Sequence, residues 1–194
     1  MKKLLQNKST AISLGLIIAS VIYSFILINK EPRYPRTNTQ SLATRFEYLS
    51  KNGNSSCSGT FNDSIFSMPD NDRIQGSCCS PMSLHRYGEQ VEGLKNYSNI
   101  REIPDDPYDI EAGLAKNLKS YYDLELTPKE QKAYDYALAN SHEKGPCCCK
   151  CWRWYVYGGL AKYLIRNYKF TDEQITEVWN LSDGCGGDSE HHHG

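Results

Sequence analysis

The chain has 194 residues, of which 39% are hydrophobic, and its formal net charge is -1. This length is enough for one domain with a hydrophobic core, and no long Gly-, Ser- or Pro-rich linker divides the sequence. The balanced charge gives no basic surface for a phosphate backbone, so we expect no nucleic-acid partner.

An uncharged apolar stretch near the N-terminus, Ala11 to Ile28, predicts a single transmembrane helix. At about 1.5 Å per residue it is just long enough to cross the hydrocarbon core of a bilayer. The alternative is a cleaved signal peptide, but its apolar core is usually shorter and a small-residue cleavage site follows it. We therefore expect residues 1–30 to be an uncleaved membrane anchor.

The orientation of this anchor has weaker support. Lysine and arginine residues lie on both flanks of the apolar stretch, so the positive-inside rule discriminates poorly between the two orientations. A short N-terminal tail is more easily left in the cytoplasm. We therefore expect a single-pass membrane protein whose soluble part is extracytoplasmic.

Beyond the anchor, the sequence predicts a stalk and then one cysteine-rich helical domain. Prolines at positions 32 and 35 predict an extended stalk over 31–40. The domain is expected over 41–194, with a short helix at 41–50 and a loop-rich start at 51–77.

Helix-start signals dominate the rest of the chain, and strand-like alternation is scarce, so we expect a mainly α fold. Asp106-Pro107 predicts a capped helix that includes Ile110. Thr127 with Glu130, and Thr171 with Gln174, have the spacing of capping boxes.

Two segments, Gly113–Leu118 and Gly159–Leu164, resemble each other, and a cysteine-bearing segment follows each at a distance. If this reflects a repeated helical unit, the cysteines would lie at equivalent ends and converge at one pole. The alternative is chance similarity between two amphipathic helices.

The densest chemical signal is a group of four cysteines within five residues: Cys147, Cys148, Cys149 and Cys151. Adjacent residues form a disulfide with each other only under strain, so the group favours metal binding or thiol exchange. Pro146 predicts a helix start. That helix would place Cys147, Cys148 and Cys151 on one face, with Cys149 pointing elsewhere. The helix dipole, Lys150 and Arg153 would then favour thiolate.

A second candidate site combines Cys78 and Cys79 with Met82 and His85. Thiolate, thioether and imidazole are ligand types used by copper proteins. A helix opened by Pro81 would place Met82 and His85 on one face. The alternative is that Met82 fills the core and His85 is a surface residue.

Three other positions complete the candidates. Cys185 lies in a glycine-rich loop that allows a close backbone approach, so it could supply a ligand or pair in a disulfide. His142 precedes the cysteine group and is either a ligand or a helix-end surface residue. We assign no site to the terminal His191, His192 and His193.

The function predicted from these patterns is capture, storage or transfer of a soft metal ion by a thiolate cluster. Copper as Cu(I) is expected first, with zinc or Hg(II) as alternatives, and a membrane protein that donates or accepts the metal is the expected partner. We expect binding rather than catalysis.

One alternative is a thiol-disulfide oxidoreductase or redox sensor that uses Cys148 and Cys151. Another is an interaction domain in which disulfides join the four grouped cysteines to Cys57, Cys78, Cys79 and Cys185.

Overall fold

The structure, a computed structural model, describes residues 41–187. The predicted membrane span at 11–28, the predicted stalk at 31–40 and the terminal histidines lie outside the described residues. Within 41–187, no helix combines the length and the apolar character needed to cross a bilayer. The prediction of a mainly α domain is confirmed.

The described part consists of seven α-helices, two short 3-10 helices and one two-stranded sheet. In chain order they are α2 (Leu42–Asn52), α3 (Gly59–Ser64), η1 (Ile65–Ser67), β1 (Arg73–Gln75), α4 (Leu84–Leu94), η2 (Lys95–Tyr97), β2 (Asp109–Glu111), α5 (Ala112–Ser120), α6 (Pro128–Asn140), α7 (Trp152–Tyr168) and α8 (Asp172–Ser182). The segment at 51–77 thus contains α3, η1 and β1 with irregular stretches between them.

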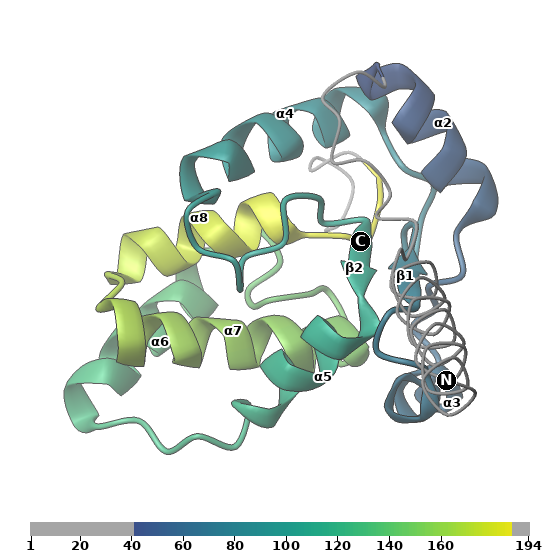
Figure 1. Ribbon diagram of the computed structural model, residues 1–194. Helices are drawn as coiled ribbons and strands as arrows, with labels where there is room; N and C mark the ends of the chain where they lie inside the picture. The colour runs from purple at the N-terminus through teal and green to yellow at the C-terminus, as the bar shows by residue number, and fades with distance from the viewer. Residues whose placement is uncertain (1–40, 188–194) are drawn as a thin grey trace, which may run out of the picture. The chain divides into compact units, whose positions relative to one another are not determined.

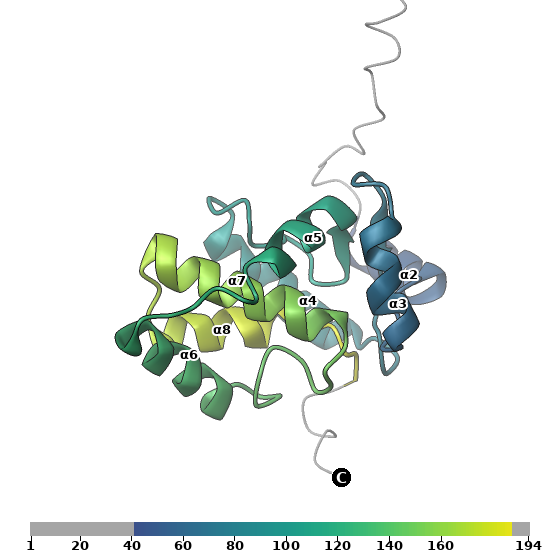
Figure 2. The ribbon, with the colours of Figure 1, turned by 90° about the horizontal axis from the view of Figure 1, so that it is seen from below.

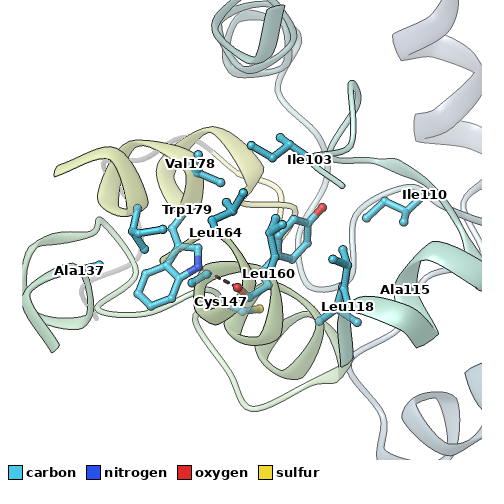
Figure 3. Close-up of a cluster of buried hydrophobic side chains, with 14 of the residues drawn as sticks. Ile103, Ile110, Ala115, Leu118, Ala137, Cys147, Leu160, Leu164, Val178 and Trp179 are labelled. Carbon is cyan, nitrogen blue, oxygen red and sulfur yellow. Dashed lines mark hydrogen bonds between the residues drawn. The ribbon is translucent and has the colours of Figure 1, made fainter. Parts of the chain in front are cut away.

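Helix α7 is the central element, because it packs against α5, α6 and α8 (Figures 1 and 2). Its apolar residues are buried over most of its circumference. Trp179 of α8 is also buried, and its indole Nε1 donates a hydrogen bond to the backbone carbonyl of Tyr157 at 3.0 Å (Figure 3). Removing this much aromatic surface from water is a major stabilising contribution to the core.

The two similar segments lie on helices that pack directly against each other, α5 and α7. The contact requires glycine at position 159, because a Cβ there would lie 2.0 Å from the carbonyl oxygen of Leu118. The close approach of the two backbones therefore depends on the absence of a side chain.

Both predicted capping boxes are confirmed. Thr127 accepts a hydrogen bond from the backbone of Glu130, whose carboxylate accepts one in return at the start of α6. Thr171 and Gln174 make the same reciprocal pair at the start of α8. These bonds satisfy N–H groups that have no partner within the helix.

The helix predicted after Asp106-Pro107 starts later than expected. Ile110 belongs to strand β2, which pairs antiparallel with β1 and places Ile110 opposite Ile74, and helix α5 begins only at Ala112. The Asp106 carboxylate accepts bonds from the Tyr108 backbone, the Tyr87 hydroxyl and Arg45 instead of capping a helix. A short polar side chain that binds nearby backbone N–H groups stabilises a turn at this position.

Candidate metal centre

The loop before α7 is not the helical turn predicted from Pro146. Helix α7 begins at Trp152 with Cys151 as its N-cap, and residues 147–150 form bends. The backbone reverses at Lys144 and Gly145, which have positive φ angles of 51° and 153°. A Cβ at Gly145 would lie 2.6 Å from the Trp154 ring, so the loop packs too closely for a side chain there. The predicted shared helical face is therefore wrong, and another arrangement groups the sulfur atoms.

The glycine-rich segment after α8 pairs with the segment that contains Cys78 and Cys79. The backbone N–H of Cys79 donates to the carbonyl of Cys185 at 3.2 Å, and the N–H of Ser80 donates to the same oxygen at 2.8 Å. A Cβ at Gly186 would lie 2.0 Å from the Ser80 carbonyl oxygen. The predicted close approach of this loop to a neighbouring backbone is confirmed, and it carries Cys185 to Cys78 and Cys79.

Cys57 reaches the same place through the irregular segment before α3. The N–H of Ser55 donates to the carbonyl of Gln75 at 3.0 Å, and the Ser55 hydroxyl accepts from the Trp152 indole at 3.1 Å. The Cys57 thiol then lies 3.2 Å from the carbonyl oxygen of Cys78. Sequence reasoning assigned Cys57 no metal-binding role, because no other candidate ligand is close to it in the chain.

All eight cysteines are free thiols, and their sulfur atoms form one connected cluster. Four segments supply them: the segment before α3, the segment before α4, the loop before α7 and the segment after α8. The Sγ–Sγ distances are 2.6 Å for Cys57–Cys79, 3.0 Å for Cys148–Cys185, 3.1 Å for Cys147–Cys185, 3.4 Å for Cys147–Cys151, 3.5 Å for Cys57–Cys149, 3.7 Å for Cys78–Cys79, 3.8 Å for Cys79–Cys148 and 3.9 Å for Cys79–Cys149.

Within this cluster, five sets of three sulfur atoms each lie within 4.8 Å of one another. The sets are Cys57/Cys78/Cys151, Cys57/Cys79/Cys149, Cys78/Cys147/Cys185, Cys79/Cys148/Cys185 and Cys147/Cys149/Cys151. Such sets have the size and the donor type of a binding site for a soft metal ion.

The cluster has a buried side and an exposed side. Cys147, Cys151 and Cys185 are buried, and Cys147 contributes to the hydrophobic core (Figure 3). Cys79 and Cys148 are exposed. An ion or a thiol reagent can therefore reach the cluster from solvent while its inner sulfurs stay shielded.

Sulfur–sulfur hydrogen bonding separates the pKa values of neighbouring thiols. Bonding to Cys147 and Cys151 lowers the pKa of Cys78 to about 6, and bonding to Cys147 and Cys185 lowers the pKa of Cys148 to about 5. The pKa of Cys147 is raised in turn, because its proton is held between these neighbours. Burial raises the pKa of Cys57 and of Cys79. The lowered pKa values of Cys78 and Cys148 favour their thiolate forms, and thiolate is the form that binds metal.

A buried arginine lies next to the sulfur cluster. The guanidinium of Arg153 is 1% exposed and donates to the carbonyl oxygens of Pro107 at 2.7 Å and Gly76 at 3.3 Å. The ion pairs formed within 41–187 do not include Arg153, and its Nε has no hydrogen-bond partner among those residues. Its positive charge lowers the pKa of Cys78. Lys150, predicted to act in the same way, instead directs its Nζ toward the Trp154 ring, 5.8 Å from the centroid.

The structure brings together seven of the nine predicted site residues: Cys78, Cys79, Cys147, Cys148, Cys149, Cys151 and Cys185. It adds Cys57. Cys149, expected to point away from the others, faces Cys57 and Cys79.

Met82 and His85 lie apart from the sulfur cluster. Met82 is buried in a small apolar group with Leu49, Tyr87 and Tyr108. The His85 side chain is 86% exposed, with Nε2 3.4 Å from the Glu89 carboxylate. The helix expected to start at Pro81 begins at Leu84, so the two side chains do not share a helical face.

His142 is exposed and lines an open pocket of about 450 Å³ between α6 and α8, together with Arg86 and Asn180.

Comparison of the chain with known protein families, with curated proteins and with solved structures finds no match. The chemistry of the site therefore rests on its own geometry.

Proposed function

We propose that this protein captures, stores or transfers a soft metal ion through its cysteine cluster. The observation that carries the proposal is the convergence of eight free thiols from four segments of the chain. Mutually close thiols that are not bridged carry mutually repelling charges when they ionise, and a bound cation removes that repulsion.

The geometry of the cluster favours Cu(I) among the soft ions. Zn²⁺ in structural sites takes four ligands in a tetrahedron, and at a Zn–S distance of about 2.3 Å the tetrahedron's edges are about 3.8 Å. Among residues 41–187, the groups of mutually close ligand atoms contain three sulfurs and never four. Three thiolates suit trigonal Cu(I) or Hg(II), and soft sulfur ligands select Cu(I).

Anaerobic titration of the full-length chain in detergent with Cu(I), against a competing chelator, tests the proposal. We expect stoichiometric binding that falls sharply in the triple variant Cys147→Ser, Cys148→Ser, Cys151→Ser, because four of the five sulfur sets contain at least one of these residues and only the Cys57/Cys79/Cys149 set keeps all three of its sulfurs. Circular dichroism of the variant checks that its helices form. Unchanged Cu(I) binding by a folded triple variant would contradict the proposal.

A second candidate function is thiol-disulfide exchange, favoured by one observation: the exposed Cys148 has a lowered pKa and lies 3.0 Å from the Cys185 sulfur. The Cys148 thiolate would attack a partner disulfide, and Cys185 would then displace the partner thiol. This oxidises the two cysteines to a disulfide and reduces the partner disulfide to two thiols. The pair differs from the predicted Cys148 and Cys151. Turnover with a disulfide substrate and a dithiol reductant, abolished by Cys185→Ser and retained by Cys151→Ser, would support this function.

Residues 11–28 are proposed to anchor the chain in a membrane, with the cysteine domain on the extracytoplasmic side. This proposal is supported by the length of the uncharged apolar segment. Retention of the full chain in the membrane fraction at alkaline pH, and protease accessibility of the domain from the outside of intact cells, are the expected results. Release by alkali would contradict the anchor.

A further inference from the structure

From the way the sulfur sets overlap, we infer that the cluster binds three soft metal ions and that the Cys151 sulfur bridges two of them. This inference rests on the proposed metal-binding function and specifies the number of ions. Three of the five sets, taken together, use every cysteine of the chain. They are Cys57/Cys78/Cys151, Cys79/Cys148/Cys185 and Cys147/Cys149/Cys151.

A single ion does not account for the cluster. One three-coordinate ion would use three of the eight sulfurs and leave five thiols. Of the three buried cysteines, Cys147, Cys151 and Cys185, no sulfur set contains all three. Single occupancy would therefore leave at least one buried thiol without a metal partner.

The sulfur spacing suits several neighbouring ions. With a metal–sulfur distance of about 2.3 Å, three sulfurs around a trigonal ion lie about 4 Å apart. Within the three sets, the sulfur atoms lie 3.0 Å apart for Cys148–Cys185, 3.4 Å for Cys147–Cys151 and 3.8 Å for Cys79–Cys148, and no pair in a set is more than 4.8 Å apart. Small shifts of the thiolates would therefore bring each set to the spacing of a trigonal ion.

Two of the three sets meet at Cys151. It is the only cysteine common to two of them, since the Cys79/Cys148/Cys185 set shares no sulfur with the other two. Cys151 is also the N-cap of α7, so its backbone is fixed by the central helix, and its side chain makes no capping hydrogen bond. The sulfur is therefore free to bind two ions, one toward Cys57 and Cys78 and one toward Cys147 and Cys149.

The arrangement also explains why Cys57 belongs to the cluster. Without it, the set that joins the segment before α3 to the loop before α7 loses one of its three ligands. Cys57 is held in place by the contacts of its neighbour Ser55 with Gln75 and Trp152. Two separate parts of the fold thus position Cys57, as expected for a residue that binds an ion.

Native mass spectrometry of the reduced full-length chain after anaerobic Cu(I) loading counts the ions, and X-ray absorption of the same sample tests the bridge. We expect three Cu(I) ions per chain and a metal–metal scattering component, because two ions that share one sulfur lie close together. One or two ions per chain would overturn this inference and leave the proposed function intact, whereas no bound ion would overturn both. Three ions without a metal–metal component would overturn the bridge through Cys151.

The variant Cys57→Ser provides a second measurement. It should release one ion at a lower chelator concentration than the unmodified chain does, because one set would then have two sulfurs. Release curves that coincide, with the helices intact by circular dichroism, would exclude Cys57 from the cluster and overturn the three-ion arrangement. Since the ion count of the unmodified chain needs no variant, the inference stays testable even if Cys57→Ser does not fold.

Discussion

Arg153 is the residue whose burial is best explained by the chemistry of the sulfur cluster. A guanidinium withdrawn from water has a large desolvation cost unless an anion compensates it. Its donors reach two carbonyl oxygens, and its face packs 4.6 Å from the centroid of the Trp152 ring. Carbonyls and rings compensate a full charge only in part. Thiolates that bind a monovalent ion retain excess negative charge, so a metal-loaded cluster would supply further counter-charge to Arg153.

Replacing Arg153 with methionine should weaken metal binding more than it weakens the fold. The variant keeps most of the side-chain volume and removes the positive charge. Breaking a buried charge pair costs about 3–5 kcal/mol, which corresponds to a loss of roughly a hundredfold or more in affinity. Chelator competition with Cu(I) measures the affinity, and thermal unfolding of the metal-free protein measures the fold.

Arg153→Lys is the matched control, since it retains the charge and alters the two hydrogen bonds. We expect it to recover a large part of the affinity that methionine loses. Equal affinities for the unmodified chain and Arg153→Met would show that the charge does not act on the metal.

Gly184 allows the backbone to pass directly over the Arg153 guanidinium. A Cβ at position 184 would lie 2.1 Å from the central guanidinium carbon, whereas a Cβ at Gly59 would meet nothing within 4 Å. Gly184→Ala should therefore lower the free energy of unfolding by about 1–3 kcal/mol through overpacking. Gly59→Ala, at the start of α3, should change it by less than about 0.5 kcal/mol. Denaturant titration compares the two, and an equally small effect of both would show that the chain relaxes around position 184.

At the scale of helices, the contact of α6 with α7 makes a pH-dependent contribution to the stability of the fold. The Arg166 guanidinium lies 2.9 Å from the Glu130 carboxylate and, together with the Thr127 backbone N–H, lowers the pKa of Glu130 from 4.5 to about 2. A carboxyl group whose pKa is lower in the folded than in the unfolded state stabilises the fold above its unfolded pKa. That stabilisation is lost as pH falls toward the folded pKa.

The variant Glu130→Gln should therefore be less stable than the unmodified chain at pH 6, and the difference should shrink between about pH 4.5 and pH 2. Thermal unfolding of both proteins across this range measures it. A stability difference that stays constant down to pH 2 would show that the carboxylate charge is not what joins Glu130 to Arg166.

Elements with local signals were predictable from the sequence. The starts of α6 and α8 are encoded within four residues each, in Thr127 with Glu130 and in Thr171 with Gln174. Pro146, also a good first helical residue, gave a wrong start for α7, because Gly145 packs against the Trp154 ring and turns the chain first. That contact depends on tertiary structure, which a local motif does not report.

At the scale of the whole molecule, the sequence predicted the chemical type of the site. It predicted only some of the residues that form it. Sulfur density in the chain pointed to a thiol cluster, and the flexible glycine-rich loop pointed to Cys185 as a partner. Cys57 was missed because its position depends on hydrogen bonds to Gln75 and Trp152, which are distant in the sequence. Met82 and His85 were close in the sequence, yet they belong to a core and to a surface that share no face.

The cluster joins segments from both ends of the domain, so metal binding should stabilise the whole described fold. An ion that binds only the folded state at a hundred times its Kd adds about 2.7 kcal/mol, or roughly 5–10 °C in melting temperature for a chain of this size. Cu(I) should therefore raise the melting temperature, and a soft-metal chelator should reverse the change. Mg²⁺, which prefers oxygen ligands, is the control and should give no shift.

Hydrogen exchange locates this stabilisation. The segments 78–81, 141–151 and 184–187 carry or adjoin seven of the eight cysteines and lack helical hydrogen bonds of their own, so their amides should gain the most protection on Cu(I) loading. Helix α6 carries no cysteine, so its exposed face should change little. Cysteine segments that gained no more protection than the exposed face of α6 would contradict the local effect of binding. An increase caused equally by Mg²⁺ would show that the effect does not come from sulfur ligands.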